Sequence, residues 1–362
     1  MSCAKPIPTE PEQTRMQHIA PLFNGPLDIV GDVHGEIRAL DDLMEVLGYD
    51  AGVHPDGRRL VFLGDLCDRG PDSPAVIERV QDLVERDLAQ CVLGNHELNL
   101  LRNASKEGNR WFIDPDHPEQ RGDFFASKPA PPHRKADWAT FFETLPLALE
   151  RADLRLVHAA WHAPSIAILR ATDAPTIQVF DEYAARSKAD LFESGLGAAA
   201  DSERLAHADA IFDSKRPVPL LRNLGLRDEH FQMTNPLRIV TSGVERVTDT
   251  PFWAGGKWRM CDRVRWWNEY HDDIPVIIGH YWRIAGDRSG ESLSDGKPDM
   301  FDGARFGQWQ GARGNVYCVD FSVGGRYRER ARNVQENFKT HLAAVRWPER
   351  EVVFEDGHRA NL

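Results

Sequence analysis

The sequence lacks the long apolar runs that mark membrane-spanning helices. No stretch of its 362 residues approaches the roughly 18 consecutive apolar residues that such a helix needs. The N-terminus has no basic start followed by an apolar stretch, so no signal peptide is indicated. Only five cysteines occur, without a Cys-x-x-Cys pair, which predicts reduced thiols rather than a disulfide framework. Together these absences predict a soluble, cytoplasmic protein.

Positive charge is also scarce. The chain has 44 lysines and arginines against 56 acidic residues, which gives a formal net charge of −12. A negative protein has no general attraction to nucleic acid or to anionic membranes, so we expect neither as a partner. An anionic substrate would therefore need a local basic pocket. The length and the hydrophobic content of 41% allow a sizeable buried core.

Three strand–turn–helix units follow a proline-rich start. Residues 1–26 show no sustained hydrophobic period and predict a flexible tail. Strands are then expected at 27–30, 59–63 and 90–93, each followed by glycine and a helical pattern. Consecutive βα units predict a parallel sheet with right-handed crossovers. In such sheets ligands bind at the carboxyl ends of the strands.

The rest of the chain is less regular. Residues 103–135 are polar and proline-rich, and 165–235 have a largely helical pattern. Further strands are expected at 154–157, 237–240 and 274–278, and an antiparallel meander over 315–321, 341–347 and 351–355.

Metal-ligand residue types stand directly after five of the expected strands. They occur in Gly31-Asp32-Val33-His34-Gly35, Gly64-Asp65-Leu66-Cys67-Asp68-Arg69-Gly70, Gly94-Asn95-His96-Glu97, at His158 and in Gly279-His280. Glycine before a ligand lets the backbone approach a metal or phosphate closely, because it has no Cβ. Mixed oxygen and nitrogen ligands suit manganese, iron, zinc, cobalt or nickel better than calcium. We expect manganese first.

The motifs predict a site for two divalent metal ions. Asp32, His34 and Asp65 would hold one ion, and Asp65 would bridge to a second ion held by Asn95, His158 and His280. Two divalent cations outweigh two carboxylates, so the site would attract an anion. A water bridging the two ions would have a lowered pKa and would supply a hydroxide for in-line attack.

Three further residues fit the remaining chemistry. His96 is the candidate proton donor to the leaving oxygen, and Asp68 the residue that orients it. Arg69 would grip phosphate oxygens with its planar fork, and Asn95 would also contact substrate. Asp68 and Arg69 could instead form a structural ion pair in a turn. We assign Glu36 and Glu97 to helix N-termini.

This series of motifs resembles the calcineurin-like metallophosphoesterases, in the branch shared by phosphoprotein phosphatases and diadenosine tetraphosphatases. The resemblance covers roughly residues 27–325. It implies an α/β fold with a central β-sandwich flanked by helices in four layers, and the same roles for the six metal ligands and for His96 with Asp68; Asp320 matches a late strand of the family more loosely. For this family His158 and His280 are far apart in sequence, which indicates an inserted cap. We therefore expect one domain over 27–362 with insertions at about 103–135 and 165–270.

One departure from the family bears on the substrate. Leu93 stands where phosphoprotein phosphatases of the eukaryotic type usually carry an arginine that contacts phosphate. Either another basic residue replaces it, with Arg102, Arg110 and Arg265 as candidates, or the substrate differs.

Three functions remain open. The first is a serine/threonine protein phosphatase-like phosphomonoesterase, whose partner is a phosphorylated protein or a small phosphoester. The second is a bis(5'-nucleosyl)-tetraphosphatase or polyphosphate hydrolase, slightly favoured by Leu93 and by an aromatic-rich segment. The third, a non-catalytic scaffold, ranks last because the ligand set is complete. For the aromatic residues we expect burial in a helical insert rather than nucleobase stacking; they are Phe252, Trp253, Trp258, Trp266 and Trp267.

Overall fold

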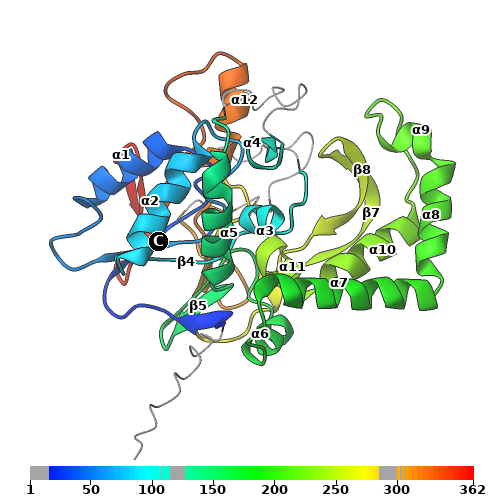
Figure 1. Cartoon of the computed structure of the whole chain (residues 1–362), viewed down its shortest axis with the longest axis horizontal. Helices are drawn as coiled ribbons and strands as arrows, with labels where there is room; N and C mark the ends of the chain where they lie inside the picture. The colour runs from blue at the N-terminus through cyan, green and yellow to red at the C-terminus, as the bar shows by residue number, and fades with distance from the viewer. Residues whose placement is uncertain (1–15, 107, 115–126, 285–299, 302–303, 306) are drawn as a thin grey trace, which may run out of the picture.

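Two β-sheets stacked face to face form the centre of the molecule, and helices cover their outer sides (Figure 1). The computed structural model describes residues 16–106, 108–114, 127–284, 300–301, 304–305 and 307–362. This arrangement confirms the predicted α/β fold class. Within the described ranges no helix combines the length and the apolar character needed to cross a membrane. The four cysteines in these ranges are free and buried, whereas Cys3 lies outside them.

The larger sheet has six strands in the order β13-β12-β11-β2-β3-β4. Their bounds are β2 Leu27–Val30, β3 Arg59–Phe62, β4 Ala89–Cys91, β11 Ala343–Trp347, β12 Glu351–Phe354 and β13 Arg359–Asn361. β2, β3 and β4 run parallel, as the three βα units predict. β11 pairs antiparallel with both β2 and β12, and β12 with β13, so the C-terminal part of the predicted meander is confirmed.

The smaller sheet has five strands in the order β1-β5-β6-β9-β10, and it corrects two predictions. The bounds are β1 Ile19–Pro21, β5 Ala148–Arg151, β6 Leu154–Val157, β9 Val276–Ile278 and β10 Val316–Cys318. The predicted tail over 1–26 is too long, because β1 pairs in parallel with β5 and Leu22 is buried beside it. β10 does not join the meander, because it pairs in parallel with β9 in this sheet.

The alternation of side chains along β2 divides the core into two parts. Leu27 and Ile29 are buried between the sheets, together with Leu156 of β6 and Tyr317 of β10. Val30 belongs to the core on the helix side. Because successive strand residues point to opposite faces, both faces of β2 are buried.

Short helices connect the strands and frame their carboxyl ends. They are α1 Ile37–Leu47, α2 Ser73–Glu85, α3 Asn95–Leu101, α4 Arg110–Ile113, η2 Pro132–Arg134, α5 Lys135–Thr144, η4 Val323–Gly325 and α12 Arg326–Ala331. α1 ends at Gly48, whose φ of 93° is the left-handed conformation that favours glycine at a helix C-cap. α2 begins at Asp72, whose side chain accepts a hydrogen bond from the backbone N–H of Ala75.

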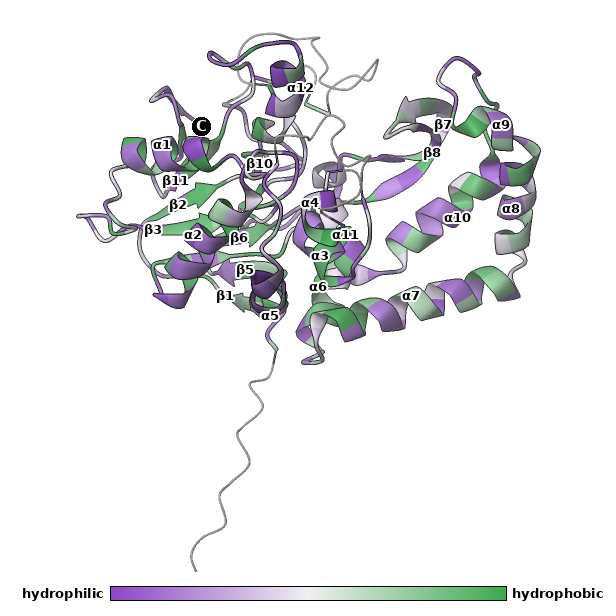
Figure 2. Cartoon of the chain, turned by 45° about the horizontal axis from the view of Figure 1, so that its top comes forward, coloured by the Kyte–Doolittle hydropathy of each residue, from purple (hydrophilic) through white to green (hydrophobic). Residues whose placement is uncertain are grey.

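Residues 163–269, the insert, form a lobe beside the sheets (Figure 2). The elements are α6 Ala163–Arg170, α7 Thr176–Glu193, α8 Leu196–Ala206, α9 Ala208–Ile211, α10 Arg222–Met233, α11 Pro236–Ser242, β7 Glu245–Ala254, β8 Lys257–Arg263 and η3 Trp266–Glu269. The lobe has a small core of its own, with Leu221, Leu224 and Met260 among its members. The helical pattern over 165–235 is confirmed.

Two predictions for the insert are wrong. The segment 237–240 is helical rather than a strand, because Asn235 caps α11 by accepting from the N–H groups of Leu237 and Arg238 and Pro236 occupies its first turn. The aromatic residues are not all buried in a helical insert. Trp266 and Trp267 are buried in η3, whereas Phe252, Trp253 and Trp258 are half-buried on the β7–β8 hairpin.

Candidate metal centre

The side chain of Asp65 lies at the middle of a cluster of buried imidazoles. Its Oδ2 atom is 3.4 Å from Nε2 of His158, 3.7 Å from Nε2 of His34 and 3.8 Å from Nε2 of His96. Two groups with ligand atoms close enough to hold a metal ion share this carboxylate: His34, Asp65 and His96, and Asp65, His158 and His280. The arrangement therefore offers two adjacent cation positions joined by Asp65.

Five of the predicted site residues adopt left-handed backbone conformations. The φ angles are 47° at His34, 48° at Asp65, 72° at Asp68, 67° at Arg69 and 65° at His280. This conformation costs a non-glycine residue roughly 1–3 kcal/mol, so the surrounding structure must hold it. The backbone N–H of His34 donates to the carbonyl oxygen of Asp65, which ties the first two motifs together. Strain is thus concentrated where strand ends turn their side chains toward the centre.

Glycines allow the carboxylates to sit against neighbouring strand ends. A Cβ on Gly94 would lie 2.3 Å from Oδ1 of Asp65, and a Cβ on Gly279 would lie 2.1 Å from Oδ1 of Asp32. The close approach expected at these glycines therefore exists. It brings the backbone against the carboxylates of other motifs, which the sequence alone does not show.

Backbone carbonyls fix the orientation of two of the imidazoles. Nδ1 of His34 lies 2.9 Å from the carbonyl oxygen of Cys67, and Nδ1 of His158 lies 2.6 Å from that of Leu63. A carbonyl accepts only, so each Nδ1 carries the proton. Both Nε2 atoms face Asp65, and a neutral ring offers a lone pair there, as metal-binding histidines usually do.

The side chain of Asn95 lies at the second of the two cation positions, the one formed by Asp65, His158 and His280, where several acceptor atoms meet. Its Oδ1 lies 3.3 Å from Nε2 of His158. With the amide turned over, its nitrogen would instead lie 2.8 Å from Nδ1 of His280 and 3.2 Å from the carbonyl oxygen of Thr241. In the first orientation the amide oxygen faces Nδ1 of His280 and the carbonyl oxygen of Thr241, and only a proton on Nε2 of His158 can act as a donor to it. A cation would satisfy all of these acceptors, so the residues present fit a divalent metal ion.

Asp32 and Asp320 stand beside each other at the edge of this cluster. The carboxylate of Asp32 accepts from the backbone N–H of His280 at 3.1 and 3.2 Å, and it lies 3.9 Å from Nε2 of His34. Asp320 is buried and accepts from the N–H of Ser322 at 2.8 Å. Its Oδ2 has no hydrogen-bond partner among the described residues.

Burial and neighbouring charges shift the pKa values of the two carboxylates, Asp32 and Asp65, in opposite directions. Burial raises the pKa of Asp32 well above its usual value, and the charge of Asp320 adds to the rise. Burial alone would also raise the pKa of Asp65, but the charge of His158 leads the effects that hold it well below the usual range. Asp65 and Asp32 in turn overcome burial at His158 and raise its pKa to about 10. A cation at Asp65 must displace that proton, so metal binding here releases protons.

His96 is held by a carboxylate on one side and faces Arg69 on the other. Its Nδ1 lies 2.5 Å from Oδ2 of Asp68, and its Nε2 lies 3.0 Å from a guanidinium nitrogen of Arg69. Another nitrogen of Arg69 lies 2.7 Å from Nε2 of His34, and the guanidinium stacks 4.9 Å from the ring centre of Trp282. The structure therefore pairs Asp68 with His96 and not with Arg69.

Two residues that support the site were not assigned this role from the sequence. Nε1 of Trp111, on α4, donates to Oδ1 of Asp68 at 2.6 Å. Glu97 caps α3, as predicted, but its buried carboxylate also accepts from the backbone N–H groups of Asp65 and Leu66 at 2.9 and 2.8 Å. Only its place in the Gly-Asn-His-Glu motif could have indicated this contact, and no sequence signal marked Trp111.

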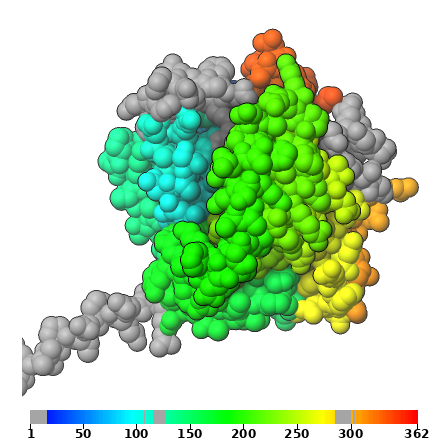
Figure 3. Space-filling view, turned by 90° about the vertical axis from the view of Figure 1, so that its right-hand side faces the viewer, coloured from blue at the N-terminus to red at the C-terminus, as the bar shows by residue number. Residues whose placement is uncertain are grey.

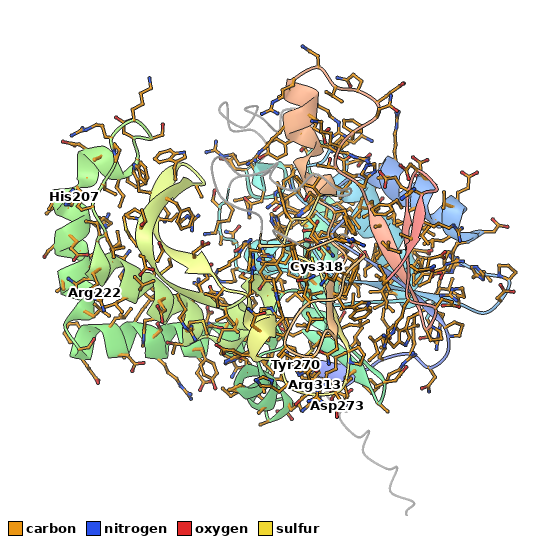
Figure 4. The ribbon with its side chains drawn as sticks, turned by 180° about the vertical axis from the view of Figure 1, so that it is seen from behind. His207, Arg222, Tyr270, Asp273, Arg313 and Cys318 are labelled. Atoms are coloured by element: carbon orange, nitrogen blue, oxygen red, sulfur yellow. The ribbon has the colours of Figure 1, made fainter. Side chains whose placement is uncertain are left out.

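The structure brings all nine predicted site residues to one edge of the sheets. Cys318, labelled in Figure 4, is the last residue of β10, and its Sγ donates to the carbonyl oxygen of Gly279, next to His280. Tyr270, Asp273 and Arg313 mark the opposite end. Of the candidates for the missing phosphate contact, Arg102 lies at the C-terminal end of α3 and its guanidinium packs 3.8 Å from the ring centre of Phe180.

Comparisons with known proteins place these observations in context. The bis(5'-nucleosyl)-tetraphosphatase PrpE of Geobacillus thermodenitrificans is 52% identical over 80 residues, which are 21% of this chain and 33% of that protein. The PrpE of Oceanobacillus iheyensis is 45% identical over 80 residues, 21% of this chain and 32% of its own. The chain thus matches about a third of the length of these relatives.

A solved structure and a family model complete the comparison. A cold-active protein-tyrosine phosphatase of a Shewanella species aligns with 96% of this chain and 82% of its own, at 13% identity and a TM-score of 0.43. The model of the calcineurin-like phosphoesterase family matches residues 25–207, half of the chain. The chain belongs to the calcineurin-like phosphoesterase family.

Proposed function

We propose that this chain is a two-metal hydrolase of nucleoside polyphosphates, and that Asp65 joins its two cations. Asp32, His34 and Asp65 would hold one ion, and Asp65, Asn95, His158 and His280 the other. The observation that carries this proposal is the position of Asp65 Oδ2 within 3.8 Å of three imidazole nitrogens. When bound, two such ions neutralise the phosphate and supply an activated water.

Arg69 is the proposed phosphate clamp. Two of its guanidinium nitrogens lie 2.7 and 3.0 Å from the Nε2 atoms of His34 and His96, so the fork stands across the front of the cluster. A planar guanidinium can donate two parallel hydrogen bonds to phosphate oxygens. Stacking on Trp282 holds the group in this position without using any of its donors.

His96 is the proposed proton donor. Asp68 accepts from Nδ1–H of His96, so Nε2 is the atom that exchanges a proton with substrate. In the structure Nε2 accepts from Arg69, so Arg69 must turn to the phosphate before Nε2 can carry the proton. In the reaction the bond between phosphorus and the leaving oxygen breaks, and Nε2 transfers its proton to that oxygen. Asp68 stabilises the protonated ring before this transfer.

The relatives and Leu93 favour a dinucleoside polyphosphate as the substrate. The matched proteins are named bis(5'-nucleosyl)-tetraphosphatases. Leu93 is fully buried, so it provides no polar group to a phosphate. Both points favour the second of the functions expected from the sequence over the first. A phosphoprotein substrate is the other candidate, supported by the His96–Asp68 pair that resembles the protein phosphatases.

Metal removal followed by a substrate panel tests the proposal. The protein is stripped with a chelator, reloaded with manganese, and assayed with p-nitrophenyl phosphate, diadenosine tetraphosphate and phosphoserine peptides. We expect turnover only with metal, and a higher kcat/KM for the tetraphosphate than for the peptides. Loss of turnover in His96→Asn is expected, with His271→Asn as the matched control. His271 is exposed and precedes β9, at the opposite end of the strand from His280.

Metal-independent turnover, or equal turnover of wild type and His96→Asn, would overturn the mechanism. A preference for the phosphopeptides would overturn the substrate assignment and leave the mechanism standing.

A further inference from the structure

Five basic side chains lie together where the insert meets the end of α3. We call them the insert cations: Arg102, Lys106, Arg238, Lys257 and Arg259. They come from four segments that are distant in sequence, namely the end of α3, the loop after it, α11 and β8. Figure 3 shows the face on which the segment around residue 100 meets the insert, with a hollow between them.

Direct contacts place two of these groups side by side. The guanidinium carbons of Arg102 and Arg238 lie 3.8 and 5.2 Å from the ring centre of Phe180, so both cations share one aromatic ring. On the β7–β8 hairpin, Lys257 pairs with Ala254 and Arg259 with Phe252, two positions apart on one strand. Residues two apart on a strand point to the same face, so Lys257 and Arg259 share a face of the hairpin.

Carboxylates lie near the insert cations but, among the described residues, form no ion pair with them: the charge of Asp181 acts on Arg102, that of Glu245 on Arg238 and Lys257, and that of Asp228 on Lys257. Within the described residues none of the insert cations has an Asp or Glu oxygen within 4.0 Å. Other arginines of the same lobe do have such partners: Arg227 lies 3.0 Å from Asp228, and Arg246 lies 3.8 Å from Glu229. The chain has a net charge of −12, yet these five neighbouring cations have no carboxylate in direct contact in the described part of the chain.

The charges of the group act on Lys106. Burial lowers the pKa of this lysine, and the charges of Arg102, Arg238, Lys257 and Arg259 lower it further. Burial likewise lowers the pKa of Arg238, with Arg102 adding to the effect. An anion placed among these groups would relieve that repulsion.

Two helices connect the insert cations to the metal centre. α3 starts at Asn95 and its C-cap is Arg102, so its seven residues span about 10 Å between the two sites. α11 carries Arg238 and, one turn later, Thr241, whose carbonyl oxygen faces the Asn95 amide. A ligand bound at the metal centre must therefore extend about one short helix length to reach the cations.

We propose that the insert cations bind the phosphates of the substrate that are not hydrolysed, and so select an oligophosphate chain over a simple phosphate monoester. The inference rests on the proposed function, because it concerns the part of the same substrate that lies away from the metal centre. A monoester such as p-nitrophenyl phosphate carries no second phosphate and cannot reach the group. An oligophosphate is a linear polyanion and can contact both sites.

Direct binding of inorganic tripolyphosphate to the metal-free full-length protein tests the site without turnover. We expect titration calorimetry to show at least tenfold weaker binding to Lys257→Gln/Arg259→Gln than to wild type, and weaker binding of both at high salt. The matched control is Lys188→Gln/Arg222→Gln, which removes the same charges from exposed positions on α7 and α10. It should bind within twofold of wild type.

Turnover supplies the second measurement. With manganese restored, the ratio of kcat/KM for diadenosine tetraphosphate to that for p-nitrophenyl phosphate should fall at least tenfold in Lys257→Gln/Arg259→Gln, through KM. The inference would be overturned if tripolyphosphate bound equally to both double variants. It would also be overturned if an acidic phosphopeptide bound to the insert cations and tripolyphosphate did not. Charge-dependent tripolyphosphate binding in a protein that hydrolyses no tetraphosphate would support the binding site and overturn the proposed function instead.

Discussion

Nε1 of Trp111 donates a hydrogen bond to Oδ1 of Asp68 at 2.6 Å, and the other oxygen of this carboxylate lies 2.5 Å from Nδ1 of His96. Trp111 belongs to α4 in the proline-rich segment, whereas Asp68 and His96 follow β3 and β4. Both oxygens of Asp68 are therefore held, one by the indole and one by the imidazole. A residue outside the motifs thus sets the orientation of the proposed proton donor.

We expect Trp111→Phe to lower kcat about tenfold and to leave KM nearly unchanged. The substitution keeps the ring in the core and removes only the hydrogen bond, so Asp68 would hold His96 less firmly. The acidic and basic limbs of the pH–rate profile should shift, which a purely structural role of Trp111 would not cause. Steady-state kinetics from pH 5 to 9 measure both effects.

Trp138→Phe is the matched control. Trp138 is fully buried with its ring centre 6.3 Å from that of Trp111, and its Nε1 has no hydrogen-bond partner in the described part of the chain. Equal kinetic losses in the two variants would show that Trp111 acts through packing alone.

Gly279→Ala is expected to remove one of two bound metal ions. The new Cβ would lie 2.1 Å from Oδ1 of Asp32, and a carboxylate displaced by this contact can no longer serve as a ligand. Metal analysis after dialysis against manganese should give about two ions per chain for the wild type and about one for the variant. Gly197→Ala in α8 is the control, because its Cβ would lie 3.3 Å from the nearest atom, the carbonyl oxygen of Leu191 in α7. An unchanged metal content in Gly279→Ala would argue against Asp32 as a ligand.

The sequence predicts the local parts of this molecule better than its long-range contacts. The predicted ligands lie close together, as expected, because each stands just after a strand, and a few residues are enough to define a strand end. Trp111 was missed because its contact with Asp68 joins segments 43 residues apart, which no periodicity encodes. The composition of Leu237 to Val240 is typical of a strand. The segment is nevertheless helical, because Asn235 caps the helix N-terminus.

The buried carboxylate of Asp28 provides a stability test away from the metal centre. It accepts from Nε and Nη2 of Arg58, both at 3.1 Å, from Nε of Arg346 at 3.1 Å and from the hydroxyl of Tyr49 at 2.9 Å. Arg58→Met would leave this charge buried with a single cationic partner, so we expect a loss of roughly 3–5 kcal/mol in the free energy of unfolding. Urea denaturation measures the difference.

An exposed pair serves as the control for Arg58. Arg79 lies 2.6 Å from Asp41 with both side chains at least 40% exposed, and Arg79→Met should cost at most about 1 kcal/mol. If both variants lost a similar free energy of unfolding, burial would not determine how much the Asp28 network contributes to stability.

His341 predicts a pH-dependent contribution to stability. Burial alone would lower its pKa, but the hydrogen bond to Glu355 at 3.3 Å and the charges of Glu355 and Asp356 raise the pKa above the usual value. A histidine whose pKa is higher in the folded state stabilises the fold below its unfolded pKa of about 6.5, and loses this contribution as the pH rises through the folded pKa. The destabilisation caused by His341→Gln should therefore be larger at pH 5.5 than at pH 9, as measured by urea denaturation at both values.

The partner of His341 gives the decisive comparison for this prediction. In a Glu355→Gln background the imidazole loses the carboxylate that raises its pKa, although Asp356 remains 4.0 Å away. The pH dependence of His341→Gln should then shrink, because the folded and unfolded pKa values move closer together. A destabilisation that is the same at pH 5.5 and pH 9 in the wild-type background would mean that the ring contributes by packing against Phe354, whose ring centre lies 5.7 Å away, and not by its charge.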